Sequence, residues 1–80
     1  MNTRHTREDI LKATYGTMKR IAIVNISDSQ ICLCIDGEYD NLKEAKADAR
    51  QMQYTARASY DKRAQYVAVD RALRRIYKIK

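Results

Sequence analysis

A chain of 80 residues, 45% apolar but without Phe or Trp, can form one small domain with a modest core and leaves no room for a second domain. The N-terminus, MNTRHTRED, has no apolar export segment, and the longest apolar run is far too short to span a membrane, so we expect a cytoplasmic protein. The net charge is +6, with +7 on residues 50–80 and −1 on residues 1–49. This asymmetry indicates a polyanionic or acidic partner, or serves solubility alone.

The N-terminal segment contains one helix start signal. Thr6 and Asp9 have the spacing of a capping box and precede the apolar pair Ile10 and Leu11, which predicts a short helix or turn over residues 6–14, ended by Gly16. Two interpretations stay open for residues 1–17. They fold over one face of the strands that follow, or they form a mobile arm that becomes ordered only on binding.

The densest apolar run, Arg20–Asp36, predicts a β-hairpin with its turn at residues 28–29 or within 27–30. In this register the opposed pairs are Ile26 and Ile31, Val24 and Leu33, and Ala22 and Ile35. One face of the hairpin is then wholly apolar and needs a cover, because an isolated two-stranded hairpin is marginally stable. Gly37 is expected to supply the turn that closes the element.

The other face of this hairpin is mixed. It carries Ile21, Ile23, Asn25, Cys32, Cys34 and Asp36. We expect the two cysteines to be reduced and buried, since residues two apart on one strand are poorly placed for a disulfide. We expect no metal site, since the only histidine, His5, has no partner at ligand spacing.

The most regular periodicity predicts an amphipathic helix over residues 41–58, with capping-box spacing between Asn41 and Glu44. Its apolar stripe consists of Leu42, Ala45, Ala49, Met52 and Ala56. Because the stripe is mostly Ala, the helix can approach a sheet closely, and we expect it to cover the hairpin face that contains Val24 and Ile26. A second stripe, on a neighbouring flank, consists of Lys43, Lys46, Arg50, Tyr54 and Arg57. Glu44 and Asp48 fall on the opposite flank.

The last segment, residues 64–80, fits two structures. Val67 and Val69, then Tyr77 and Ile79, alternate as two strands of a hairpin joined across residues 70–74. The alternative is a helix, because Tyr66, Val69, Leu73 and Ile76 also recur at helical spacing and no Gly, Pro or Asn marks a turn. We favour the strands, which gives an α+β domain of order ββαββ: an antiparallel sheet with one amphipathic helix packed on it. The remaining face, with Ile21 and Ile23, is then covered by the N-terminal segment or by a second copy of the chain.

The sequence predicts a binding protein without enzymatic activity or cofactor. There is no evident nucleophile and base pair and no phosphate-binding glycine pattern. Cations and tyrosines that could follow phosphates or meet a partner are the better candidates. The candidate binding residues are Lys43, Lys46, Arg50, Tyr54, Arg57, Arg71, Arg74, Arg75, Tyr77 and Lys78, with Lys80 extending the C-terminal cluster. A solvated surface is the plain alternative.

Two stretches carry a resemblance to known proteins: Gly37-Glu-Tyr-Asp-Asn-Leu-Lys-Glu-Ala45 at the helix entry, and Tyr66-Val-Ala-Val-Asp70 with Arg75-Ile-Tyr-Lys-Ile79. In pattern, residues 20–79 resemble small phage-encoded proteins, including some anti-CRISPR inhibitors. The resemblance implies a non-enzymatic viral protein in the host cytoplasm, which sterically occludes a host nucleic-acid-handling complex. It assigns no role to any residue. The alternative is a basic module that binds duplex or structured DNA or RNA directly.

Overall fold

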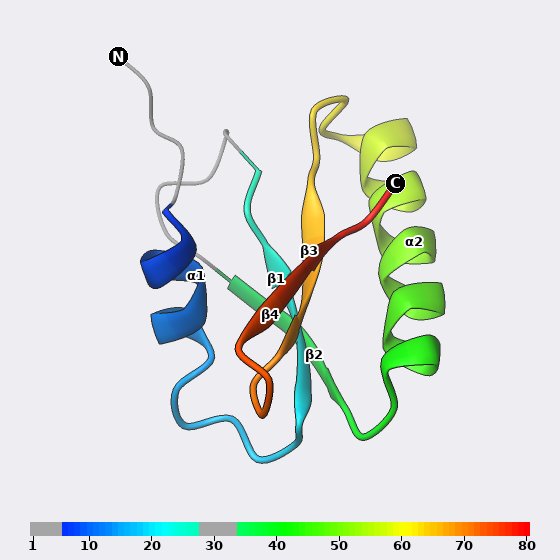
Figure 1. The fold of residues 1–80 in the computed structure, drawn as a ribbon. Coiled ribbons are helices and arrows are strands. Elements are labelled where there is room, and N and C mark those ends of the chain that lie inside the picture. The colour runs from blue at the N-terminus through cyan, green and yellow to red at the C-terminus, as the bar shows by residue number, and fades with distance from the viewer. Residues whose placement is uncertain (1–5, 28–33) are drawn as a thin grey trace.

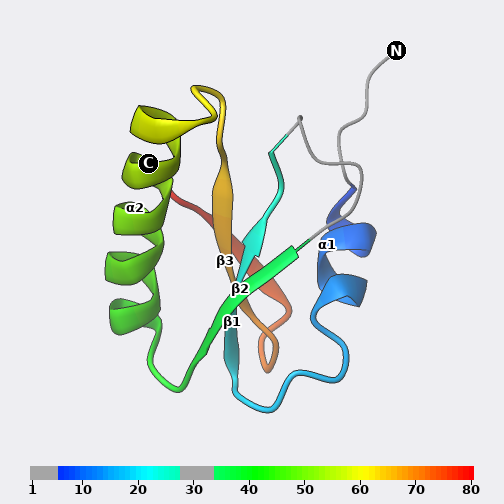
Figure 2. The same ribbon diagram turned by 180° about the vertical axis from the view of Figure 1, so that it is seen from behind.

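The computed structural model describes residues 6–27 and 34–80. In chain order the elements are α1 (Arg7–Ala13), β1 (Ile21–Asn25), β2 (Cys34–Tyr39), α2 (Leu42–Ser59), β3 (Tyr66–Asp70) and β4 (Arg75–Lys78). The strands form one antiparallel sheet in the order β2-β1-β3-β4, with α1 on one face and α2 on the other (Figures 1 and 2). The predicted ββαββ order is confirmed. Among the described residues, no helix is both long and apolar enough to cross a membrane.

Both helices begin where their caps predict. The Thr6 hydroxyl accepts a hydrogen bond from the Asp9 amide at 3.1 Å while the Asp9 carboxylate accepts from the Thr6 amide, which completes a capping box. The Asn41 side chain accepts from the amides of the second and third residues of α2, at 2.8 and 3.2 Å. Gly16, at φ +90°, lies in the turn beyond α1. Residues 6–16 therefore contain the predicted short helix and its closing turn, and Ile10 and Leu11 of this helix are buried.

The C-terminal segment is a hairpin, so the helical alternative is wrong. Its four-residue turn needs no Gly or Pro because the carboxylate of Asp70 accepts hydrogen bonds from the amides of Ala72 and Leu73, at 3.1 and 3.2 Å. Arg74 completes the turn at φ +54°, a left-handed conformation that is uncommon outside glycine. The hydrogen bonds of Asp70 thus stabilise a turn without the Gly, Pro or Asn whose absence had favoured a helix.

The register of β1 and β2 differs from the prediction by two residues at Val24 and by three at Ala22. Val24 lies opposite Ile35, where the prediction placed Leu33, and Ala22 lies opposite Glu38, where it placed Ile35. The two-residue shift at Val24 keeps side chains on their faces, so alternation of apolar residues cannot detect it, and a bulge at Asp36 adds the third residue. The predicted turn at residues 28–29, the pairing of Ile26 with Ile31, and Cys32 lie outside the described residues, and nothing is described of the Cys34 side chain.

Gly37 does not form a turn. It lies inside β2 opposite Ile23, next to a bulge at Asp36, and its φ is not positive. A Cβ atom at this position would lie 2.9 Å from Cε1 of Tyr39, closer than real Cβ contacts. The glycine therefore permits the close approach of the Tyr39 ring.

The two covers of the sheet are exchanged relative to the prediction. α2 packs on the face with Ile21 and Ile23, and α1 packs Ile10 and Leu11 on the face with Val24, together with Val67 and Val69 of β3. All residues of β1 and β3 are buried, so alternation could not tell the two faces apart. The parallel strands β2 and β3 are joined through α2 by a right-handed connection (Figures 1 and 2), the hand of nearly all such connections, and this places α2 on its face.

The predicted apolar stripe of α2 is confirmed, with one polar member that was not foreseen. Ala45, Ala49 and Ala56 are buried against the sheet, with Leu42 and Met52 at the margin. Gln53 is also buried: its amide nitrogen donates to the carbonyl of Ile79 at 3.0 Å, and its oxygen accepts from the amide of Tyr66 at 2.7 Å. These two bonds satisfy backbone groups near the ends of β3 and β4. They fix where α2 lies on the sheet, whereas the apolar stripe sets its distance from the sheet.

An ion pair between half-exposed Arg20 and buried Asp70 closes the end of the sheet at which β1 begins and β3 ends. Arg20 donates from Nε and Nη2 to the two carboxylate oxygens of Asp70, at 3.1 and 2.9 Å. Asp70 is only 2% exposed. The bidentate guanidinium bond holds the pKa of Asp70 below its usual value despite the opposing effect of burial.

Candidate functional site

The two charged flanks of α2 face the two opposite edges of the sheet. On the basic flank, Nζ of Lys46 lies 4.4 Å from the ring centroid of Tyr77 in the edge strand β4. On the acidic flank, Asp48 hydrogen-bonds the hydroxyl of Tyr39 in the other edge strand, β2, and burial together with this carboxylate raises the pKa of Tyr39. The charge polarity of the helix therefore continues into the strands beneath it.

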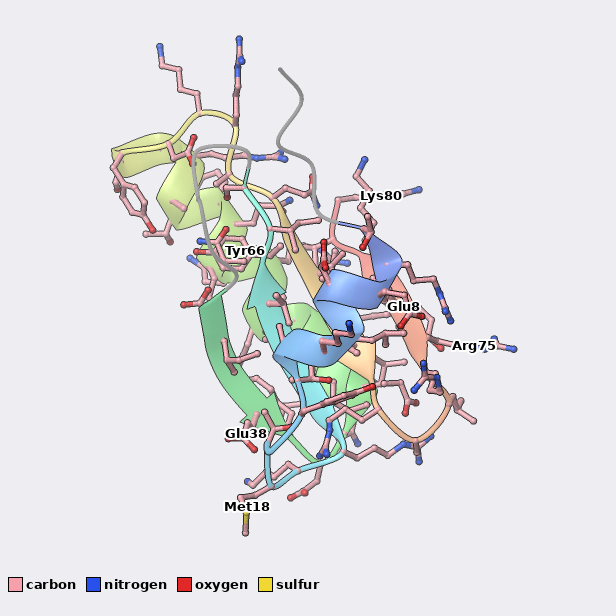
Figure 3. The ribbon with its side chains drawn as sticks, turned by 90° about the vertical axis from the view of Figure 1, so that its left-hand side faces the viewer. Glu8, Met18, Glu38, Tyr66, Arg75 and Lys80 are labelled. Carbon is pink, nitrogen blue, oxygen red and sulfur yellow. The ribbon has the colours of Figure 1, made fainter. Side chains whose placement is uncertain are left out.

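We define the basic edge by the candidate residues that lie on the basic flank of α2 and on β4, with the C-terminal lysine. They are Lys43, Lys46, Arg50, Tyr54, Arg75, Tyr77, Lys78 and Lys80. Figure 3 shows Arg75 and Lys80 projecting from this edge, on the side opposite Glu38. Tyr54 is 71% exposed, whereas Lys46 and Tyr77, which contact each other, are half-buried, and Tyr77 packs against the core under α2. The structure thus brings together cations that are separated by some thirty residues in the sequence.

Three of the predicted cations hold loops in place. Arg57 donates from Nε to the carbonyl of Ala64 at 2.8 Å, which ties the end of α2 to the start of β3. Arg71 donates to the carbonyls of Thr17 and Lys19, at 2.8 and 2.9 Å, and so anchors the loop before β1. Arg74 lies 3.9 Å from Glu8 of α1. These side chains are less available to a partner than the basic edge.

The acidic edge was only partly foreseen. It consists of Asp36, Glu38 and Asp40 in and after β2, with Glu44 and Asp48 of α2. Glu38 accepts hydrogen bonds from the amides of Met18 and Lys19, which lowers its pKa, and Asp40 lies 3.7 Å from Lys19. Sequence reasoning placed Glu44 and Asp48 on one flank and Asp36 on the hairpin, but it missed Glu38 and Asp40 because it set that strand three residues too early.

A shallow hollow of about 390 Å³ lies where α2 overhangs the acidic edge. Met52, Tyr60 and Tyr66 supply apolar surface, and Asp36 supplies a carboxylate whose pKa is raised by burial. Burial, and next the hydrogen bond with the hydroxyl of Tyr60, raise the pKa of the Tyr66 phenol. The hollow therefore contains a hydrogen-bonded tyrosine pair and one partly desolvated acid.

Within residues 6–27 and 34–80, no three His, Cys, Asp or Glu side chains lie close enough together to hold a metal ion. Comparisons with protein-family models, with curated proteins and with solved structures find no match to this chain. The arrangement of the two charged edges is accordingly the feature from which function has to be argued.

Proposed function

We propose that this protein is a small, non-enzymatic binding protein of the phage inhibitor kind, which docks its basic edge on a host complex that handles nucleic acid. One observation carries the proposal: cations from α2 and from β4 meet at a single edge, joined by the contact between Lys46 and Tyr77. An edge of this kind fits an acidic or nucleotide-bearing surface. By covering that surface the protein excludes nucleic acid sterically, and no chemical step is needed.

Direct binding to duplex or structured nucleic acid is the second candidate, and Tyr54 favours it. Its ring is 71% exposed and lies on the same helix flank as Lys43 and Arg50. A tyrosine among cations can stack on a base or donate a hydrogen bond to a phosphate while the cations neutralise the backbone. The two candidates use the same surface and differ in what that surface contacts.

The test compares the wild type with Lys43→Glu/Arg50→Glu. The matched control is Lys62→Glu/Arg63→Glu, which makes the same change of charge in the loop between α2 and β3. Each protein is titrated with a short nonspecific DNA duplex over a range of salt concentrations, and each is used to capture partners from host lysate with and without nuclease treatment. For the proposed inhibitor we expect a protein partner that survives nuclease and that only Lys43→Glu/Arg50→Glu loses, with weak duplex binding even at low salt.

Direct nucleic-acid binding gives a different pattern. Affinity for the duplex would then fall steeply with salt, with a logarithmic slope of roughly 0.9 for each phosphate contact, and nuclease would remove the captured material. Equal binding by the two double variants and the wild type in both assays would show that the basic edge is only a solvated surface.

A further inference from the structure

The two edges of the sheet are complementary in charge and in strand direction, and we propose that they associate head to tail, with β4 of one copy beside β2 of the next. The occupant of each edge is a second copy of this chain. The contact joins two different surfaces of the protein, so it is heterologous and can extend beyond a dimer.

Strand direction supports this contact. The four strands alternate in direction, and β2 and β4 at the two ends of the sheet are therefore antiparallel to each other. Placing a second copy in the same orientation beside the first sets β4 against an antiparallel β2, which continues the pattern of the sheet. All copies of α2 then lie on the same side of the extended sheet.

Backbone groups are oriented to make this pairing. The amide of Ile79 donates to the carbonyl of Tyr66, so odd-numbered residues of β4 turn toward β3, and Ile76 and Lys78 turn outward. In the same way, Ile26 and Arg20 bond to residues of the β3 segment, which directs odd-numbered β1 residues toward β2 and leaves the backbone of Glu38 outward. Both edges thus present backbone donors and acceptors to a neighbour.

Charge supports the same contact, because the basic flank of one α2 meets the acidic flank of the next. Four strands at roughly 4.8 Å place successive copies about 19 Å apart, and helices with a Cα radius of roughly 2.3 Å leave a gap of about 14 Å between their backbones for the side chains of both. Lys43 and Arg50 on one side, with Glu44 and Asp48 on the other, have side chains long enough to bridge it. Sheet twist of roughly 20° per strand makes the helices cross, so the charges meet over part of their length.

Two features limit the strength of the contact. β4 has only four residues and β2 is bulged at Asp36, both of which shorten strand pairing at an open edge. Each copy also carries a net charge of +6, which opposes close approach. The association is therefore reversible, concentration-dependent and sensitive to salt.

This inference does not rest on the proposed function, although the acidic edge of a neighbour and a polyanionic partner compete for the same basic edge. Self-association is measured on the pure protein without partner or nucleic acid. If self-association is not observed, the proposed binding to a partner still stands. If partner binding is not observed, the proposed self-association still stands.

The experiment is sedimentation of the full chain over a range of concentrations at low and high salt, with two complementary variants. Glu44→Lys/Asp48→Lys reverses the acidic edge, and Lys43→Glu/Arg50→Glu reverses the basic edge. For the wild type we expect an average mass that rises with concentration beyond that of a dimer and falls with salt. Each variant alone should associate at least about tenfold more weakly, while an equimolar mixture should regain association beyond a dimer, since both contacts of an alternating chain again join flanks of opposite charge.

A second pair of variants tests backbone pairing. Lys78→Pro removes an outward amide and Lys78→Ala removes only the side chain, so the proline variant should keep its fold but associate more weakly than the alanine variant. A wild type that remains monomeric at low salt, one that stops at a dimer, or a mixture that fails to associate would each overturn the proposal. Equal association of Lys78→Pro and Lys78→Ala would overturn the strand pairing within it.

Discussion

The two faces of the sheet are covered in opposite ways. On one face, an 18-residue helix lies close to the strands because its contact stripe is mostly Ala, and Gln53 fixes it with two hydrogen bonds to the backbone. On the other face, a seven-residue helix contributes only Ile10 and Leu11 to a surface of branched residues from β1 and β3. The small side chains of α2 thus let a long helix lie close to the sheet. The larger side chains of α1 let a short helix cover the opposite face.

This difference predicts opposite sensitivities. The α2 face should resist loss of volume and suffer from added volume, since Ala45 and Ala49 leave no space between helix and sheet. The α1 face should suffer from lost volume, since two side chains make up most of its cover. A helix as short as α1 is not stable alone, so its order depends on those contacts.

The largest expected effect is that of Leu11→Ala on the α1 face. Leu11 is 3% exposed, and its truncation should lower the free energy of unfolding by about 3 kcal/mol, from lost burial and the cavity left behind. Chemical denaturation measures the loss, and amide exchange should show α1 opening before α2. Equal protection of both helices in the variant would show that the two faces unfold as one unit.

Added volume on the α2 face comes next. Ala49→Leu should cost about 2 kcal/mol, because a buried position without free space has to push the helix from the sheet. The matched control is Ala47→Leu, at an exposed position of the same helix, which should leave the melting temperature nearly unchanged. An unaltered melting temperature for Ala49→Leu would contradict the close packing of this face.

A change within the sheet should affect both faces alike. Asp70→Asn removes the ion pair with Arg20 and should cost about 1–2 kcal/mol at neutral pH. Because the folded pKa of Asp70 lies below its unfolded value, the stability it contributes is present above about pH 4 and is lost as the pH falls through the folded value. The difference in unfolding free energy between wild type and variant should therefore shrink below pH 4. A difference that is constant with pH would rule out this ionic contribution.

The smallest effect compares the two helix caps. Thr6→Ala and Asn41→Ala should each cost about 1 kcal/mol, the usual value of an N-cap. Their consequences should differ, since α1 depends on its first turn to place Ile10 and Leu11, whereas α2 has four more turns. Amide exchange should show that Thr6→Ala loosens the whole of α1 and Asn41→Ala only the first turn of α2. Similar loss of amide protection in both helices would show that α1 does not depend on its cap more than α2 does.

Much of the candidate site was predictable because helical spacing fixes angular position. The separation of Lys43, Lys46 and Arg50 from Glu44 and Asp48 follows from 100° per residue, and the helix occurs where its stripe and cap predict. The joining of this flank to Tyr77 was not predictable, because it depends on where β4 lies in the sheet. The loop contacts of Arg57, Arg71 and Arg74 were equally hidden, since a charge pattern does not show which carbonyls a guanidinium can reach.

The sequence by itself determined the extent of α2, where both helices begin and which residues of α2 are apolar, because caps and periodicity are local; it left residues 64–80 open between a hairpin and a helix. Only the tertiary structure decided the register of β1 and β2, the face that each helix covers and the edge that each charged flank of α2 meets. A two-residue register shift preserves alternation, and strands buried on both faces look alike from either side. These choices rest on the hand of the connection through α2 and on contacts between distant residues, which local pattern does not contain.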